Sequence, residues 1–168
     1  MEITFSLDKF DNSILKNLER SIKTLNQRHI RYGWLNGKIH PIARVPIAQV
    51  ASWQEFGLPA TSNSPALPAR PYFRQAVNKI RYSYNTDIKN IFLSALEGRD
   101  MDSHLNFLAE NIRVSYGNSI ASQNYSHLAP YTVKLKGHKY QMFDSGAMIS
   151  NFNSKVYKQS LNNIKVGG

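Results

Sequence analysis

The residues that could do chemistry in this chain are few, and their spacing forms no familiar catalytic or metal-binding set. The 168-residue sequence contains no cysteine, which excludes disulfides and removes the thiolate ligand that many zinc sites use. No phosphate-binding or dinucleotide-binding glycine motif is present. We therefore expect no metal and no cofactor. The five histidines lack the spacing of metal ligands: His29, His40, His104, His127 and His138.

One serine, in the triplet Asp144-Ser145-Gly146, could suggest a nucleophile. A serine nucleophile also needs a base and an oxyanion hole, and no neighbouring pattern indicates either. A turn or helix start explains the triplet better, with Asp144 accepting backbone N–H groups and Gly146 adopting a backbone that other residues avoid. We therefore predict a structural triplet and a chain that is not an enzyme.

A second group of polar residues surrounds the loop 58–69. Glu55 is the only acid between Arg20 and Arg81, a stretch that holds ten Lys or Arg residues. We expect its carboxylate to pair with Arg70 or Arg74 and so to tie the two ends of the loop together. In a purely structural interpretation, Glu55-Phe56-Gly57 is a helix end with Phe56 in the core and Gly57 as the C-cap. Alternatively, Arg70, which precedes Pro71, presents an exposed guanidinium to a partner.

The formal net charge of +10 is unevenly distributed. Residues 111–168 carry seven basic residues and one acid, whereas residues 87–110 carry five acids and two basic residues. Such a field favours anionic partners, either DNA or the acidic surface of another protein. A solvated basic surface without a partner is the remaining alternative.

Hydrophobic periodicity predicts a single domain, 1–168, of class α+β, with a small, mostly antiparallel sheet packed against helices and a long helical hairpin. No apolar run is long enough to cross a membrane. Apolar residues of the first predicted helix, from Ile14 to Leu25, fall on one helical face. We predict strands at 1–7, 30–35 and 151–159, with another at 161–166. Helices are expected at 14–25, 46–57, 73–95 and 102–120, with irregular chain at 40–46 and 123–139.

The loop 58–69 contains three prolines and two serines. It is too short for a domain linker, so we interpret it as an exposed functional loop. Pro71 then fixes the backbone just before the long helix. In that helix, Phe73 and Tyr84 lie on the apolar seam, which favours a place in the core over stacking on nucleic-acid bases.

Five short phrases follow one another along the chain: RYGW (31–34), VASWQEFG (50–57), PARPYF (68–73), APYTVKLKG (129–137) and FDSGAMISNF (143–152). In this order they resemble the phage tail-completion, neck or virion morphogenesis family of long-tailed phages, including Mu-type tail proteins. The resemblance covers nearly the whole chain. Ser145 replaces the usual threonine of the last phrase, Met142-Phe143 replaces the usual Pro-Leu before it, and the loop 58–69 is long.

The resemblance implies a non-enzymatic virion subunit, assembled in the host cytoplasm, that helps join tail to head. Its expected partners are further copies of itself in a ring, most simply a hexamer, together with neighbouring head-connector and tail proteins. Non-specific contact with phage DNA in the channel is expected, and contact with a membrane is not. A tail-terminator ring subunit and a basic nucleic-acid-binding module are the two alternatives. The implied interface and structural residues are Glu55, Phe56, Gly57, Arg70, Pro71, Asp144, Ser145 and Gly146.

Overall fold

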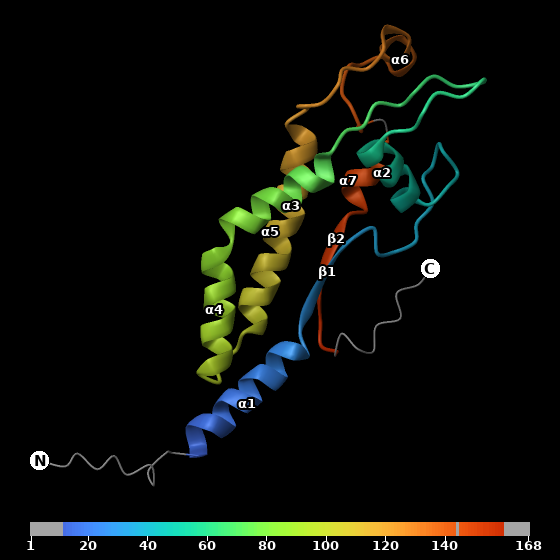
Figure 1. The fold of residues 1–168 in the computed structure, drawn as a ribbon. Coiled ribbons are helices and arrows are strands. Elements are labelled where there is room, and N and C mark those ends of the chain that lie inside the picture. Colours follow the sequence, from blue (N-terminus) through green and yellow to red (C-terminus); the bar gives the residue numbers. More distant parts are fainter. Residues whose placement is uncertain (1–11, 144, 160–168) are drawn as a thin grey trace, which may run out of the picture.

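The computed structural model describes residues 12–143 and 145–159, and Figure 1 shows their arrangement. The strands predicted at 1–7 and 161–166 lie outside the described residues. The order of elements is α1 (Asn12–Asn26), β1 (His29–Gly33), α2 (Ile47–Phe56), α3 (Tyr72–Ser83), α4 (Asn85–Leu96), α5 (Asp102–Ala121), α6 (Pro130–Lys136), α7 (Ala147–Ser150) and β2 (Asn153–Tyr157).

The predicted α+β class is confirmed. β1 and β2 form an antiparallel pair in which His29 lies opposite Tyr157 and Gly33 opposite Asn153. α5 packs against both strands on one side and against α3 and α4 on another (Figure 1). Within the described residues the sheet has these two strands, and α5 is the helix that packs on both of them.

The prediction of one continuous helix over 73–95 is wrong, because the chain bends at Tyr84 between α3 and α4. Tyr84 has φ −105° and ψ 20°, and its hydroxyl lies 3.0 Å from Ser115 Oγ and 3.3 Å from the Asn111 carbonyl oxygen on α5. The residues at the bend, Tyr84-Asn85-Thr86, are weak helix formers. Because the apolar periodicity continues through these residues, the sequence pattern does not predict the break.

The prediction of irregular chain over 123–139 is also wrong in part, because this segment contains α6. Ala129 is extended, with φ −58° and ψ 144°, and Pro130 occupies the first turn, where a missing N–H costs nothing. Gly137 ends the helix in the left-handed conformation with φ 73°. Ala129 and Gly137 are therefore the two ends of a short helix.

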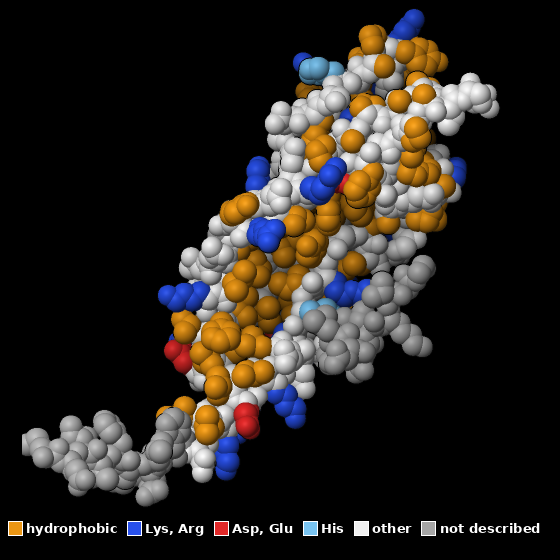
Figure 2. Space-filling view, in the orientation of Figure 1, with side chains coloured by type: hydrophobic (Ala, Val, Ile, Leu, Met, Phe, Trp, Pro, Cys, Tyr) orange, Lys and Arg blue, Asp and Glu red, His pale blue; other side chains and the backbone are white. Residues whose placement is uncertain are grey.

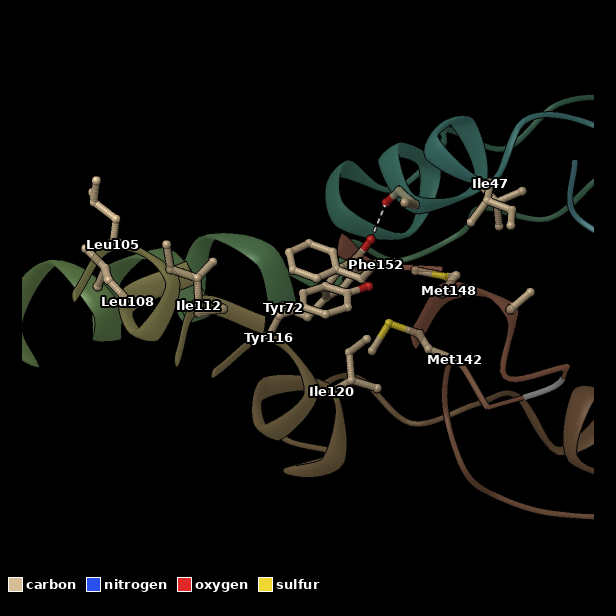
Figure 3. Packing of buried hydrophobic residues seen from close by; sticks show 14 of the residues in the cluster. Ile47, Tyr72, Leu105, Leu108, Ile112, Tyr116, Ile120, Met142, Met148 and Phe152 are labelled. Carbon is tan, nitrogen blue, oxygen red and sulfur yellow. Dashed lines mark hydrogen bonds between the residues drawn. The ribbon is translucent and has the colours of Figure 1, made fainter. Parts of the chain in front are cut away.

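The core centres on an aromatic cluster where α3, α5 and β2 meet (Figure 3). Tyr116 and Phe152 stack with ring centroids 3.7 Å apart, and Trp34 meets both edge-on at 5.5 Å. Phe73 packs against this cluster, as predicted. The helix expected at 102–120 is confirmed as α5, and its apolar residues at helical spacing are buried: Leu105, Leu108, Ile112, Tyr116 and Ile120.

The helix predicted at the N-terminal end is confirmed as α1, but most of its apolar face is open to solvent. Ile14, Leu15, Leu18 and Ile22 are 63%, 45%, 40% and 47% exposed. One described tether to the rest of the fold is Ser21, whose hydroxyl donates to the Ala95 carbonyl of α4 at 2.7 Å. In Figure 1, α1 projects from the end of the molecule opposite the loop 58–69.

Candidate functional site

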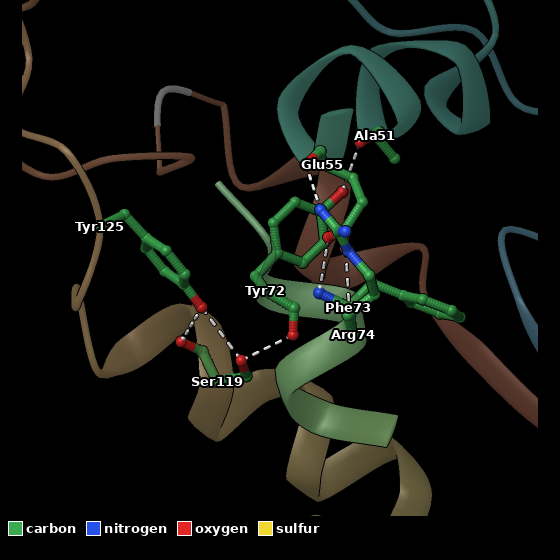
Figure 4. A network of polar contacts seen from close by, with 7 residues as sticks. All are labelled: Ala51, Glu55, Tyr72, Phe73, Arg74, Ser119 and Tyr125. Carbon is green, nitrogen blue, oxygen red and sulfur yellow. Dashed lines mark hydrogen bonds and ion pairs between the residues drawn. The ribbon is translucent and has the colours of Figure 1, made fainter. Parts of the chain in front are cut away.

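Glu55, at the end of α2, connects that helix to the first turn of α3 (Figure 4). Its side chain is only 4% exposed. Oε2 accepts the Phe73 N–H at 2.8 Å, and Oε1 accepts the Arg74 N–H at 3.2 Å and Arg74 Nε at 2.8 Å. The ion pair predicted for Glu55 is therefore present, with Arg74. The same carboxylate caps α3, whose first N–H groups have no partner within the helix.

We call the contact of Glu55 with Phe73 and Arg74 the clamp. A chain of hydrogen bonds continues from the clamp into the core. The Tyr72 hydroxyl donates to the Ala51 carbonyl oxygen of α2 at 2.7 Å, and the Ser119 hydroxyl of α5 donates to the Tyr72 carbonyl oxygen at 2.7 Å. The Tyr125 hydroxyl lies 2.7 Å from the Ser119 carbonyl oxygen. Burial raises the pKa of Tyr72 far above its ordinary value, so this hydroxyl stays a donor. Tyr72 and Ser119 were not among the predicted site residues, because a tyrosine and a serine at helical spacing carry no distinctive signal.

Phe56 and Gly57 occupy the base of the loop 58–69 in different ways. The expectation of a core Phe56 is wrong: the residue is 67% exposed, with the Arg74 guanidinium 5.3 Å from the ring centroid. Gly57 has φ 75°, and a Cβ there would lie 2.6 Å from the Leu67 carbonyl oxygen and 2.8 Å from Ala69 N. Glycine is required because the returning strand of the loop passes against it.

Arg70 is buried and does not present the exposed guanidinium considered from the sequence. Its side chain is 3% exposed, its Nη1 donates to Gln54 Oε1 at 2.8 Å, and its backbone N–H donates to the Gln54 carbonyl oxygen at 2.7 Å. Nε has no partner, and no carboxylate of the described residues pairs with this guanidinium. Burial lowers the pKa of Arg70. Pro71 directly precedes α3, as predicted.

The loop 58–69 forms a narrow two-stranded ribbon. Leu58 pairs with Leu67 and Thr61 with Ser64, each as an isolated antiparallel bridge. All residues of the ribbon are exposed except Leu67, which is partly buried. The expectation of an exposed loop is confirmed, and the ribbon leaves the body from a base fixed by Gly57 and Arg70.

A cavity of about 960 Å³ opens between this ribbon, the segment 127–136 and the ends of α2 and α7. We call it the loop cavity. Its walls are mostly apolar and include Val50, Leu67, Leu128 and Met148, with Arg70 among the polar residues that line it. An apolar cavity that holds a few convergent polar groups is the form that binding sites usually take.

His40 and Ser145 also meet at the loop cavity, and neither their pairing nor its geometry could be foreseen from the sequence. The buried His40 ring lies with Nε2 3.4 Å from Ser145 Oγ. Its Nδ1 accepts N–H groups from Ala43 at 3.1 Å and Ile42 at 3.3 Å, so the ring proton is on Nε2. His40 therefore donates toward Ser145, which is the reverse of what a general base does for a nucleophile.

The predicted turn is present at Ser145 and Gly146, which lead into α7. Gly146 has φ 64°, and Ser145 Oγ accepts the Ala147 N–H at 3.3 Å. The acceptor expected from the sequence, Asp144, lies outside the described residues. The structure thus brings Ser145 close to the loop cavity, whereas Glu55 and Phe56 lie at the clamp.

Among residues 12–143 and 145–159, no three His, Asp or Glu side chains gather as a metal site would need. No helix in this part of the chain has the length and apolar character to cross a membrane. Comparison with known proteins gave no match to a family model, a curated protein or a solved structure.

Proposed function

We propose that this chain is a non-catalytic phage virion subunit that helps join tail to head, as a neck or tail-completion protein. The observation that carries the proposal is the convergence of the family-like phrases, which span residues 31–152. Trp34 from the first phrase packs on Phe152 from the last, and Trp34 Nε1 donates to the Met148 carbonyl oxygen at 2.9 Å. The second and third phrases meet where Glu55 Oε2 accepts the Phe73 N–H at 2.8 Å.

This convergence supports the proposal because a shared architecture must place the same phrases against one another. The clamp fixes an exposed ribbon beside a cavity, and nothing in the His40–Ser145 geometry supplies a base for catalysis. Both features suit a subunit that works by docking. We further propose that the chain forms a closed ring, most simply a hexamer, because heterologous contacts that close by rotation produce rings. A tail-terminator ring remains a variant of the same proposal.

The direct test is mass spectrometry of purified virions from the phage that encodes the chain, with cryo-electron microscopy of the neck. We expect the chain in mature particles, as a ring around the DNA channel. Its absence from mature particles would replace the structural role with that of an assembly factor.

The net charge of +10 favours a second candidate, a basic nucleic-acid-binding module. DNA binding by the purified chain, measured over a range of salt concentrations, separates the two. Tight binding by the monomer, falling steeply with salt, would favour the module. Weak binding together with ring formation would favour the junction subunit.

A further inference from the structure

Two apolar features are left uncovered by the part of the chain that the structure describes, and they lie at opposite ends of the molecule. One is the exposed face of α1, and the other is the loop cavity beside the ribbon 58–69 (Figure 1). In Figure 2, hydrophobic side chains continue along the visible face as far as the end where α1 lies. Because the two features are at opposite ends, α1 cannot reach the loop cavity of its own chain.

The exposed face of α1 has the spacing of a helix that docks into a groove. Leu15, Leu18 and Ile22 follow one another at intervals of three and four residues, and all are 40% exposed or more. Glu19, the only acid of α1, is exposed and stands next to this stripe. The three basic residues of α1, Lys16, Arg20 and Lys23, lie farther round the helix, so Glu19 is the charge nearest to the apolar stripe.

The loop cavity has complementary chemistry. Its walls are mostly apolar, and its buried Arg70 guanidinium has a hydrogen bond to Gln54 but no carboxylate among the described residues. A buried cation without a counter-ion is costly, and an incoming carboxylate would relieve that cost. The cavity is therefore suited to an apolar segment that carries a negative charge.

We propose that α1 of one copy docks in the loop cavity of a second copy, with its apolar stripe against the cavity walls and Glu19 directed toward Arg70. The contact is heterologous, since each copy offers α1 at one end and the loop cavity at the other. Repetition of such a contact gives a ring if the rotation closes and an open chain if it does not. The inference names the contact that would build the proposed ring. It rests on the proposed self-assembly of the chain and does not depend on a place in the virion.

The test uses two full-length variants at exposed positions, so that the fold is retained. Leu18→Asp damages the stripe and leaves the cavity intact, whereas Ala66→Trp fills the cavity mouth and leaves α1 intact. Light scattering after size-exclusion chromatography should show assemblies for the wild type and monomers for each variant alone. Mixed in equal amounts, the two variants should form a heterodimer and nothing larger, because only one intact contact remains between them.

Matched controls change the same elements elsewhere. Lys16→Asp alters the opposite face of α1, and Ala60→Trp places the same indole on the ribbon outside the cavity lining. Both should assemble like the wild type. Glu19→Gln should weaken assembly about 10-fold, because it removes the charge for Arg70 and leaves the apolar stripe unchanged.

A wild-type chain that stays monomeric, or variants that assemble normally, would overturn the inference. If Leu18→Asp or Ala66→Trp still formed rings, the proposed contact would be overturned, because another surface would then make the ring. The proposed function would remain in place. Conversely, a complementing pair of variants would uphold this contact even if the chain proved absent from virions.

Discussion

Two helices of this chain, α1 and α5, carry apolar residues at the same helical spacing, but only α5 buries them. Leu108 and Ile112 of α5 are 8% and 6% exposed, whereas Leu18 and Ile22 of α1 are 40% and 47% exposed. α5 lies between the sheet and the α3–α4 arm, whereas α1 packs on α4 and is hydrogen-bonded to it through Ser21 and Ala95. Periodicity thus identifies the face that needs a partner, but not whether that partner belongs to the same chain.

The largest loss of stability is expected from truncating the aromatic core beside α5, the buried helix of the two. Phe152 is 3% exposed and stacks on Tyr116, so Phe152→Ala leaves a cavity beside α5. We expect a loss of roughly 3–5 kcal/mol in the free energy of unfolding. Urea denaturation followed by circular dichroism measures it. A loss comparable to that of an exposed residue would mean that the cluster is not the centre of the core.

Gly57→Ala should come next, because it affects the base of the ribbon. The added Cβ would meet the Leu67 carbonyl oxygen and Ala69 N at a positive φ. We expect a cost of about 2–4 kcal/mol, from the left-handed backbone together with the close contact. Thermal unfolding detects it, and Gly37→Ala, at φ 61° with open space around the Cβ, is the control for backbone strain alone. Equal effects at the two positions would argue against the close approach.

Removal of the Glu55 carboxylate should destabilise the clamp by about 2–3 kcal/mol. Glu55→Ala takes away the cap of α3 and the partner of Arg74 at a buried position. Glu55→Gln keeps an acceptor and should cost less. Chemical denaturation of both variants provides the measurement, and the prediction fails if the glutamine variant is the less stable of the two.

Asp102, in the first turn of α5, forms ion pairs with Arg28, just after α1, and with Lys158, just after β2, and these pairs depend on pH. Hydrogen bonds from Lys158 and Arg28 hold the pKa of Asp102 below its ordinary value near 3.8. A lowered pKa in the folded state means that the stabilisation is complete above pH 3.8 and is lost as the pH falls through the folded value. Asp102→Asn should therefore flatten the acid limb of the stability–pH curve. Urea midpoints measured from neutral pH down to acid should show the difference, and parallel curves would contradict it.

The smallest loss of stability is expected from a substitution on the exposed apolar face of α1. Leu18→Ser should change the unfolding free energy of the monomer by no more than about 0.5 kcal/mol, because the side chain is already largely exposed. Denaturation at a concentration where the chain is monomeric tests this. A loss of several kcal/mol would show that the α1 stripe belongs to the core of its own chain.

Much of the fold could be predicted because periodicity and helix-end residues are local signals. Pro46 and Gly57 mark the two ends of α2, and the buried face of α5 follows from its spacing. The Tyr84 bend could not be predicted in this way, since it depends on a contact between Tyr84 and α5 that only the tertiary fold creates. Similarly, α6 begins at a proline that is equally compatible with a turn.

The candidate site was predictable only where one charge stood alone. Glu55 is an isolated acid in a basic stretch of the sequence, and Arg74, with which it pairs, is one of the two arginines that closely follow the loop 58–69. The burial of Arg70, the exposure of Phe56 and the approach of His40 to Ser145 all depend on how distant segments pack. No spacing in the sequence encodes them.

The ribbon 58–69 offers a practical use because the contacts that hold its base are separate from its exposed tip. Gly57, Arg70 and the Leu58–Leu67 pair fix its base, whereas Ser62 and Asn63 form an exposed turn between Thr61 and Ser64. Lengthening a loop costs little conformational entropy, about 0.6 kcal/mol for each doubling. An epitope or fluorophore-binding peptide inserted between Ser62 and Asn63 would therefore label the protein without unfolding it, and would report from beside the loop cavity.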